Sequence, residues 1–419
     1  MDKFLIYGGK PLSGSVEVAA AKNATLPILA ATLLTEAPCT IRNVPMVQDV
    51  RTMTKLLAGL GKRVEPRGNA LVLSNGKKLN PESPYDIVKQ MRASYYVLGP
   101  LLARERRAKV SLPGGCAIGP RPIDLHIKGM KALGAEVAIE HGYVTARTPR
   151  LVGAEMVLEG SHGPSVGATA NVMMAATLAR GQTVILGAAC EPEIIDLANF
   201  LNALGAKVTG IGTARLVIDG VEQLHGADFQ PIPDRIEAGT LALAGAITGS
   251  RIELTDCRPD QMTALLERLR ETGCDCEAGP QTLKVNGSPE IRPVDINTAP
   301  YPGFPTDCQA QFMALLCLAS GRSVVTEHIF EGRYLHALEL ARMGARIDID
   351  GSSAVIQGIK RFSGAQVMAS DIRASASLVL AGLAADGETE ISRIYHLDRG
   401  YVRLEEKLGR LGADVTRVK

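Results

Sequence analysis

The stretch ALGAEV at residues 132–137 occurs in six related forms along this chain of 419 residues, and that repetition decides the fold. The central glycines of the six copies are 73, 71, 68, 71 and 68 residues apart. Self-similarity at a nearly constant period indicates one supersecondary unit repeated along the chain. The copies read, in chain order, GLGKRV at 59–64, ALGAEV at 132–137, ALGAKV at 203–208, ETGCDC at 271–276, RMGARI at 342–347 and RLGADV at 410–415.

Each copy joins a helix to a strand. An amphipathic pattern such as DLHIKGMKALG at 124–134 precedes the glycine, and a short β-branched run follows it. A glycine at that point is typical of a helix C-cap, because the residue after the last helical turn often adopts a left-handed conformation. We therefore predict a helix that ends at each of these glycines and a strand that follows it.

A second helix lies upstream in every unit. Its sequences, such as ATANVMMAATLARG at 168–181 and GTLALAGAITGS at 239–250, are rich in small apolar residues on all sides. A helix that is apolar all round is buried, whereas a helix with charges on one face lies at the surface. Each unit is therefore predicted to contain a buried inner helix and a solvated outer helix.

Six such units predict an α/β fold with three units in each of two domains. The predicted form is a two-domain inside-out α/β barrel of six βαβαββ-like units, in which the sheets wrap around the inner helices. The predicted domains are residues 22–229 and a discontinuous domain of residues 1–21 with 230–419, because the N-terminal strand needs a sheet to complete.

Composition excludes several classes of protein. The 46 basic and 44 acidic residues are spread evenly, which argues against a nucleic-acid-binding surface. Neither a signal peptide nor an apolar run long enough for a membrane span appears, so we expect a cytoplasmic protein. The eight scattered cysteines predict reduced thiols rather than a disulfide framework. The histidines form no HExxH motif and Cys274-Asp275-Cys276 lacks zinc-ligand spacing, so no metal or cofactor is predicted.

Charged residues recur where the inner helices begin. A helix N-terminus carries unpaired N–H groups and a partial positive charge, so a basic side chain there opposes the dipole and requires an anion. Any one of these residues alone is explained as an ordinary first-turn residue, but four of the six are basic. The positions are Lys22, Arg92, Ser165, Arg235, Asp307 and Arg373.

The loops before the outer helices carry a second polar set. The most distinctive is SLPGGCAIGPRP at 111–122, which lacks the GK[ST] ending of a phosphate-binding P-loop. Its mixture of glycine and proline suits a lid that closes over a substrate, with Cys116 beside Arg121 as an exposed, reactive thiol or as an incidental loop cysteine. The two polar sets are expected to face each other across an interdomain cleft. The other loops are EPEIID at 191–196, FEGRY at 330–334 and YHLDRGY at 395–401.

These motifs resemble the UDP-N-acetylglucosamine 1-carboxyvinyltransferases over essentially the whole chain. Several long motifs in the same order make a chance match negligible. The matching segments are AAKNATLP at 20–27, QMRAS at 90–94, LPGGCAIGPRPIDLH at 112–126, SVGAT at 165–169, PDRIE at 233–237, FPTDCQAQF at 304–312, DIRASASLVLAG at 371–382 and YHLDRGY at 395–401.

The resemblance implies an addition–elimination reaction between phosphoenolpyruvate and the 3'-hydroxyl of UDP-N-acetylglucosamine, without a metal or cofactor. Lys22, Arg121 and Arg399 would bind the phosphate and carboxylate of phosphoenolpyruvate. Asp307 would be the general base, and Cys116 would donate a proton to C3 or add to C2 as a thiolate; Lys22 and Arg399 complete the implied catalytic set. The implied substrate-binding residues are Lys22, Asn23, Arg92, Arg121, Pro122, Ile123, Asp124, Leu125, Ser165, Val166, Gly167, Asp307, Ile329, Arg373 and Arg399.

Two positions depart from the family pattern. Gln48 and Cys190 stand where basic residues are common, which leaves room for a specialised or non-catalytic paralogue that only binds the nucleotide sugar. A second alternative is the related enzyme that uses shikimate 3-phosphate. That enzyme lacks a reactive lid cysteine in a PGGC context, so Cys116 and SVGAT favour the UDP-sugar as the acceptor.

Overall fold

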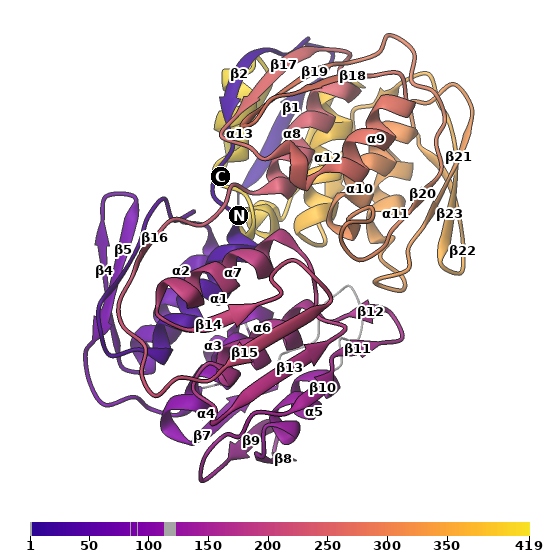
Figure 1. The fold of residues 1–419 in the computed structure, drawn as a ribbon. Helices are drawn as coiled ribbons and strands as arrows, with labels where there is room; N and C mark the ends of the chain where they lie inside the picture. Colours follow the sequence, from indigo (N-terminus) through magenta and orange to yellow (C-terminus); the bar gives the residue numbers. More distant parts are fainter. Residues whose placement is uncertain (1, 84, 90, 113–122) are drawn as a thin grey trace. The chain divides into compact units, whose positions relative to one another are not determined.

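The computed structural model describes residues 2–83, 85–89, 91–112 and 123–419 (Figure 1). By their contacts these residues form two compact units, which we call the central and the terminal unit. The central unit comprises residues 20–112 and 123–232, and the terminal unit combines residues 2–19 with Pro233–Lys419. The predicted domains, 22–229 and 1–21 with 230–419, stay a prediction about which segments fold independently.

Every four-stranded sheet among the described residues has the same topology. One edge strand runs parallel to its neighbour, and the remaining pairs are antiparallel. In the central unit these sheets are β16-β3-β5-β4 (Asp228–Phe229, Cys39–Ile41, Ala70–Asn75, Lys62–Arg67), β6-β7-β9-β8 (Glu82–Ser83, Arg107–Ser111, Tyr143–Arg147, Glu136–Glu140) and β10-β13-β15-β14 (Glu155–Val157, Gln182–Leu186, Arg215–Asp219, Lys207–Thr209).

The terminal unit repeats this pattern. Its sheets are β2-β17-β19-β18 (Ser13–Glu17, Arg251–Thr255, Thr282–Asn286, Asp275–Ala278), β20-β21-β23-β22 (Ile296–Asn297, Arg322–Thr326, Ser353–Gln357, Arg346–Asp350) and β25-β27-β1-β28 (Gln366–Met368, Glu388–Ser392, Lys3–Tyr7, Asp414–Val418). Two short pairs, β11-β12 (Glu159–Gly160, Gly163–Pro164) and β24-β26 (Phe362–Ser363, Ala385–Asp386), complete the strands that are described.

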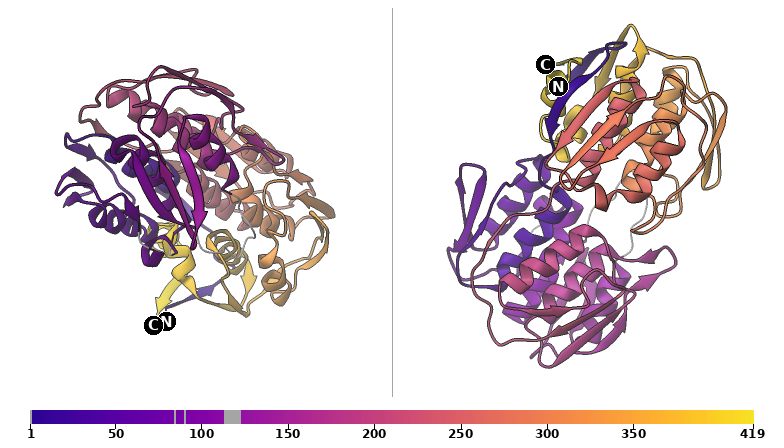
Figure 2. Two further views of the ribbon diagram at one scale, coloured as in Figure 1. Left: turned by 90° about the horizontal axis from the view of Figure 1, so that it is seen from below. Right: turned by 45° about the horizontal axis from the view of Figure 1, so that its top comes forward.

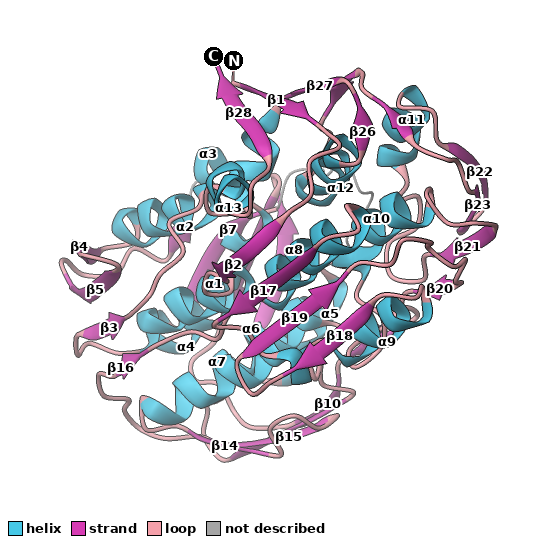
Figure 3. Ribbon diagram, turned by 90° about the horizontal axis from the view of Figure 1, so that it is seen from above, coloured by secondary structure: helices cyan, strands magenta, loops and turns pink. Residues whose placement is uncertain are grey.

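The inner helices are buried, as predicted from their composition. In the terminal unit α8, α10 and α12 pack against one another (Figure 3). Every residue of α12 from Arg373 to Leu383 is buried. The inner helices are α1 (Lys22–Ala31), η2 (Arg92–Val97) continued by α4 (Leu98–Glu105), α6 (Val166–Ala176), α8 (Arg235–Ile247), α10 (Thr306–Leu316) and α12 (Ile372–Leu383).

Most outer helices bury one face only. In α9 the buried side chains are Leu265, Leu266 and Leu269. Helix α7 is more buried than predicted for an outer helix, because Glu193 and Asp196 are buried together with its apolar face. The outer helices are α2 (Gln48–Gly59), α5 (Asp124–Ala132), α7 (Pro192–Ala203), α9 (Thr263–Glu271), α11 (Leu335–Arg342) and α13 (Leu404–Arg410), and the short helices are η1 (Thr32–Leu34), α3 (Tyr85–Val88), η3 (Pro259–Gln261) and η4 (Ile394–Arg399).

Both chain ends lie in one sheet. The N and C ends lie close together in both views of Figure 2. Strand β1 pairs antiparallel with β27 and with β28, so that Leu5 lies opposite Glu390 on one side and Thr416 on the other. The next strand, β2, pairs with β17, whereas β16, which precedes α8 in the chain, pairs with β3 of the central unit. Each unit therefore contains strands from distant parts of the sequence.

The six repeated glycines end helices in the left-handed conformation, which confirms the predicted C-caps. Their φ angles lie between 86° and 109°. An L-residue with a Cβ pays a steric penalty in this region, and glycine does not. The glycines are Gly61, Gly134, Gly205, Gly273, Gly344 and Gly412.

We expect Gly344→Ala to destabilise the protein by about 1–2 kcal/mol. A Cβ at Gly344 would meet no atom within 4 Å, so backbone strain at φ +96° is the sole cost. Gly409 in α13 is the matched control, because it is equally open but does not have a positive φ. Chemical denaturation should show Gly409→Ala unchanged or more stable by about 0.5–1 kcal/mol. Equal losses in both variants would contradict the assignment.

Candidate active site

The six predicted positions lie at the starts of the inner helices. In the terminal unit Arg235 is the first residue of α8, and Asp307 and Arg373 are the second residues of α10 and α12. In the central unit Lys22 opens α1 and Ser165 is the N-cap of α6, but Arg92 opens the 3-10 helix η2 instead of an α-helix.

Asp307 lies between two buried arginines. Its Oδ2 accepts a hydrogen bond from Arg373 Nη2 at 2.9 Å, and its Oδ1 accepts one from Arg333 Nη2 at 2.9 Å. Burial opposes the charged form of the carboxyl, but the two guanidinium groups outweigh it and hold the pKa of Asp307 well below its usual range. Asp307 is therefore a carboxylate at every physiological pH, with 28% of its side chain exposed.

Arg373 is held from its other side by Tyr401. Arg373 Nη1 donates to the Tyr401 hydroxyl at 3.2 Å, and the guanidinium lies 5.6 Å from the centre of the Tyr401 ring. The same hydroxyl is 2.9 Å from Thr240 Oγ1, and it accepts from Gln311 Nε2 at 3.3 Å. The start of α12 is thus fixed by side chains from α8, α10 and the segment after η4.

The segment YHLDRGY was predicted as a loop, and that prediction is wrong. Residues Ile394–Arg399 form the 3-10 helix η4, so Arg399 is at the end of a helical turn. Arg393, which precedes this helix, has a left-handed φ of 58°, and η4 packs against α12. Sequence patterns miss such a turn because a 3-10 helix of six residues is too short to show a hydrophobic period.

The central unit also has a buried ion pair at a helix start. Lys22 Nζ is 3.2 Å from Asp49 Oδ2, and both side chains are less than 10% exposed. Asp49 follows Gln48, one of the two departures from the family pattern, at the start of α2. A protein carboxylate therefore faces Lys22, as Asp307 faces Arg373.

The first turn of α6 packs closely against the side chain of His126. Ser165 Oγ accepts from Ala168 N at 3.2 Å, and Val166 and Gly167 follow as the first helical residues. A Cβ at Gly167 would come within 2.9 Å of His126 Nε2, so a side chain is excluded there. Asn23 is half-buried in α1. Ile123 is the N-cap of α5, and Asp124 and Leu125 are the first two residues of that helix.

Cys116, Arg121 and Pro122 lie outside the described residues. The predictions of a lid and a reactive thiol in residues 113–122 therefore stay predictions. Cys190, the second departure, is half-buried, and burial raises the pKa of its thiol.

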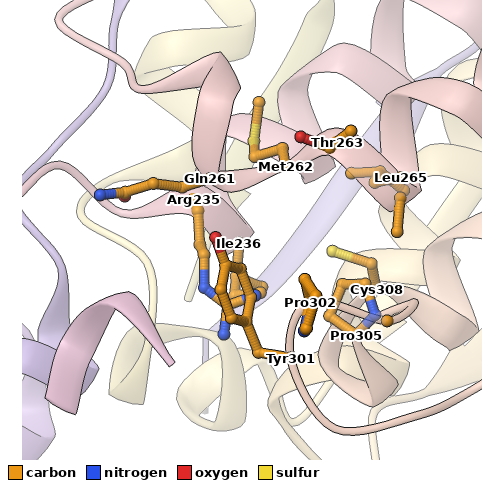
Figure 4. Close-up of a pocket in the computed structure, with 12 residues that line it drawn as sticks. Arg235, Ile236, Gln261, Met262, Thr263, Leu265, Tyr301, Pro302, Pro305 and Cys308 are labelled. Atoms are coloured by element: carbon orange, nitrogen blue, oxygen red, sulfur yellow. The ribbon is translucent and has the colours of Figure 1, made fainter. Parts of the chain in front are cut away.

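A small pocket lies beside the starts of α8 and α10 in the terminal unit (Figure 4). Arg235 and Tyr301 stand together in it, with the guanidinium carbon 5.6 Å from the ring centre. Cys308 faces the same pocket, and burial raises the pKa of its thiol to about 12. Cys308 is therefore a neutral thiol and a poor nucleophile, although it follows Asp307 in the chain.

Asp196, within the EPEIID motif, is a buried carboxyl with an unusual pKa. Its Oδ2 accepts from Ile232 N at 3.1 Å. Burial raises the pKa of Asp196 to about 7, Ile232 N–H opposes this shift, and the charge of Glu193 adds to it. The motif was predicted to line the site, but this carboxyl is directed at the chain segment that leaves the central unit.

We expect Asp196→Asn to stabilise the protein at pH 8 by on the order of 3 kcal/mol. A carboxyl whose pKa is higher in the folded state costs stability that grows as pH rises from about 4 to 7 and is then constant. The advantage of the variant should therefore be smaller at pH 5, while its amide oxygen still accepts from Ile232 N. Urea denaturation at both pH values measures the difference, and a pH-independent effect would contradict the raised pKa.

The described side chains contain no group of three His, Cys, Asp or Glu residues arranged to hold a metal ion. Every helix in the described ranges is too short or too polar to span a bilayer.

The sequence model of the family described as EPSP synthase (3-phosphoshikimate 1-carboxyvinyltransferase) matches residues 6–408. Among solved structures, the enolpyruvyl transferase NikO from Streptomyces tendae has a TM-score of 0.89 at 25% identity and is covered over 99% of its length by the whole of this chain. EPSP synthase from Acinetobacter baumannii, 18% identical with full coverage of both chains, has a TM-score of 0.77 and supports the fold alone. The chain therefore belongs to the EPSP synthase family and has its mixed α/β fold.

Similarity to curated relatives assigns the chain to one group of enzymes within this family. The proteins from Gluconobacter oxydans and Desulfosudis oleivorans are 54% and 52% identical to this chain, with 100% of each chain covered. Both are named UDP-N-acetylglucosamine 1-carboxyvinyltransferase. This is the family that the sequence motifs predicted, and the match confirms it.

Proposed function

We propose that this protein transfers the enolpyruvyl group of phosphoenolpyruvate to the 3'-hydroxyl of UDP-N-acetylglucosamine and releases phosphate. The full-length relatives at 52–54% identity support this reaction, a step of peptidoglycan synthesis. The observation that carries the proposal is the Asp307 carboxylate, held between Arg373 and Arg333 at the start of a buried helix. We also propose that the enzyme acts in the cytoplasm and without a cofactor.

Phosphoenolpyruvate presents a phosphate and a carboxylate on three carbons, so it needs several converging cations. Lys22, Arg121 and Arg399 bind these groups in our proposal, and Arg373 contributes from α12. Lys22 and Arg373 are 7% and 5% exposed, so most of their charge is shielded from water and acts strongly on a nearby anion.

Asp307 accepts the proton of the sugar hydroxyl. A carboxylate with so low a pKa is a weak base, and it needs a change of environment to act efficiently. Phosphoenolpyruvate supplies that change, because its carboxylate competes for Arg373 and thereby weakens one of the two ion pairs on Asp307. Binding of the first substrate anion would in this way raise the basicity of the residue that activates the acceptor. The sugar oxygen attacks C2 while Cys116 protonates C3, which gives a tetrahedral intermediate. Phosphate then leaves C2 while C3 returns a proton to the Cys116 thiolate, which restores the double bond of the enol ether. In the alternative, the Cys116 thiolate adds to C2 as C3 takes up a proton, and the sugar oxygen later replaces the sulfur.

The UDP-sugar is bound mainly by helix starts. The first N–H groups of an α-helix have no partner within the helix and attract phosphate oxygens, which suits Val166 and Gly167 at the start of α6. Asn23, Arg92, Ser165 and Ile329 complete the set in our proposal. Ile123, Asp124 and Leu125 add contacts from the segment that follows the lid.

We further propose that the fold is an inside-out α/β barrel of six βαβαββ-like units, three in each domain. The common topology of the four-stranded sheets supports this arrangement, as do the six left-handed glycines at the same place in each unit. The proposed domains are residues 22–229 and residues 1–21 with 230–419.

One assay decides between the proposed reaction and its alternatives. Phosphate release is measured with phosphoenolpyruvate and either UDP-N-acetylglucosamine or shikimate 3-phosphate as the acceptor. We expect turnover with the UDP-sugar only. Turnover with shikimate 3-phosphate alone would assign the sister reaction, and calorimetric binding of the UDP-sugar without phosphate release would indicate a non-catalytic paralogue.

A further inference from the structure

Glu327 is a fully buried carboxylate that accepts four hydrogen bonds. It follows β21, and its exposed fraction is 0%. Its Oε1 accepts from Thr298 Oγ1 at 2.7 Å, from Ile329 N at 2.8 Å and from Phe330 N at 3.1 Å. Its Oε2 accepts from Thr306 Oγ1 at 2.8 Å. Both carboxylate oxygens therefore accept hydrogen bonds, and Oε1 holds the turn that carries Ile329.

Glu327 Oε2 is connected to Asp307 by hydrogen bonds through Thr306 and Arg333. Thr306 is the first residue of α10, and its hydroxyl accepts from Arg333 Nη1 at 2.8 Å. Arg333 Nη2 then donates to Asp307 Oδ1 at 2.9 Å. Because the Thr306 proton is directed to Glu327, the hydroxyl presents its lone pairs to Arg333. Glu327 thus fixes the orientation of the Thr306 hydroxyl, and the hydroxyl in turn provides the acceptor that holds Arg333.

A buried glutamate is not needed merely to fill space. Removing a carboxylate from water costs several kcal/mol, and an apolar residue of similar volume avoids that cost. A fully satisfied buried polar network instead fixes one geometry among the alternatives that loose packing would allow. Here the fixed geometry is the orientation of Arg333, which is 6% exposed and makes one of the two ion pairs to Asp307.

We propose that Glu327 is a positioning residue for enolpyruvyl transfer, which acts through Thr306 and Arg333 to hold the carboxylate of Asp307 in its reactive orientation. This inference rests on the proposed function, because Asp307 is the base of that reaction. Glu327 touches no substrate, and its effect reaches the sugar hydroxyl only through the relay.

Two variants interrupt the relay at different points. Glu327→Gln keeps an amide oxygen for the turn at Ile329 but places an NH₂ group toward Thr306, so the hydroxyl proton loses its acceptor. Thr306→Val removes the hydroxyl and retains the shape, and Thr306→Ser restores the hydroxyl. The control is Thr272→Val, which removes a fully buried hydroxyl that donates to the Leu269 carbonyl oxygen after α9 in the same unit.

The readout is kcat per folded enzyme for phosphate release with phosphoenolpyruvate and UDP-N-acetylglucosamine. We expect Glu327→Gln and Thr306→Val each to lower kcat about 10- to 100-fold, with a much smaller change in the KM for the UDP-sugar, since a misplaced catalytic group has this effect. Thr306→Ser should recover most of the rate. The double variant should be no slower than the slower single variant, because both act on one path.

The outcomes separate the inference from the function on which it rests. If the wild-type enzyme turns over but Glu327→Gln and Thr306→Val keep the kcat of Thr272→Val, the inference is overturned and the proposed function stands. Additive losses in the double variant would also overturn it. If the wild-type enzyme releases no phosphate from phosphoenolpyruvate and UDP-N-acetylglucosamine, both the inference about Glu327 and the proposed function are wrong. Should Glu327→Gln not fold, the Thr306 pair of variants still decides.

Discussion

Replacing Asp307 by asparagine is expected to lower kcat by about 10²- to 10⁴-fold, the range for loss of a general base. An amide has the shape of the carboxylate but cannot take a proton from the sugar hydroxyl. Steady-state phosphate release gives the measurement, with Asp260→Asn as the control. Asp260 is also paired with an arginine in the terminal unit, but its side chain is 61% exposed.

The same variant should also be less stable. Arg333 and Arg373 would keep their burial and lose their anion, which is expected to cost about 3 kcal/mol or more. Asp307 has a lowered pKa in the folded state, so its stabilisation is complete above its unfolded pKa of about 4 and is lost as pH falls through the lower folded value. The stability difference between wild type and variant should therefore be constant at neutral pH and shrink in acid. A kcat within a few-fold of wild type would remove Asp307 from the role of base.

Selective alkylation of Cys116 by the phosphonate epoxide fosfomycin is the second large effect that we expect. The phosphonate imitates the phosphate of phosphoenolpyruvate, so Lys22, Arg121 and Arg399 should hold it while the epoxide carbon lies near the lid thiol. Peptide mapping should find the label on Cys116 first, and faster when UDP-N-acetylglucosamine is present and the lid closes. Cys116→Asp should abolish labelling and can retain turnover, because a carboxylic acid also donates a proton.

The other seven cysteines form the internal control for this experiment. Burial raises the pKa of the Cys257 thiol to about 11 and that of the Cys276, Cys308 and Cys317 thiols to about 12, so thiolate is scarce at each of them. The pKa of Cys39 and of Cys190 is raised as well, again by burial. Label mainly on Cys39, Cys190 or Cys308, or labelling indifferent to the nucleotide sugar, would remove Cys116 from the active site.

Local patterns were enough to predict the inner helices, the outer helices and the glycines that end them, but not the 3-10 helix η4. The glycines at the helix ends, such as Gly344, follow from a steric rule that concerns one residue and its neighbours. The burial of α12 follows from a composition that is apolar on every side of the helix. The helix starts that carry Lys22, Asp307 and Arg373 follow from the period of the repeat, which the sequence displays directly.

The pairings between these elements could not be predicted in the same way. Asp307 and Arg373 are 66 residues apart, and Asp307 and Arg333 are 26 apart, yet all three meet at the start of α10. The basic residues at the helix starts predicted a substrate anion as their partner. The structure shows that two of them already face protein carboxylates, Lys22 facing Asp49 and Arg373 facing Asp307. The sequence signal for Arg333 was its place in the FEGRY motif, which was predicted as a polar loop before an outer helix. The structure adds that this arginine is buried.

By itself the sequence determined the family, the glycines at the helix ends, the inner and outer helices and the residues that open the inner ones, because each of these depends on short-range periodicity and on motifs. Tertiary structure alone decided that β1 lies between β27 and β28, that Lys22 faces Asp49, that Asp196 is buried, and that Glu327 reaches Asp307 through Thr306 and Arg333. The physical reason is that hydrogen-bond partners and desolvation depend on which distant segments pack together, and a local pattern carries no record of that packing.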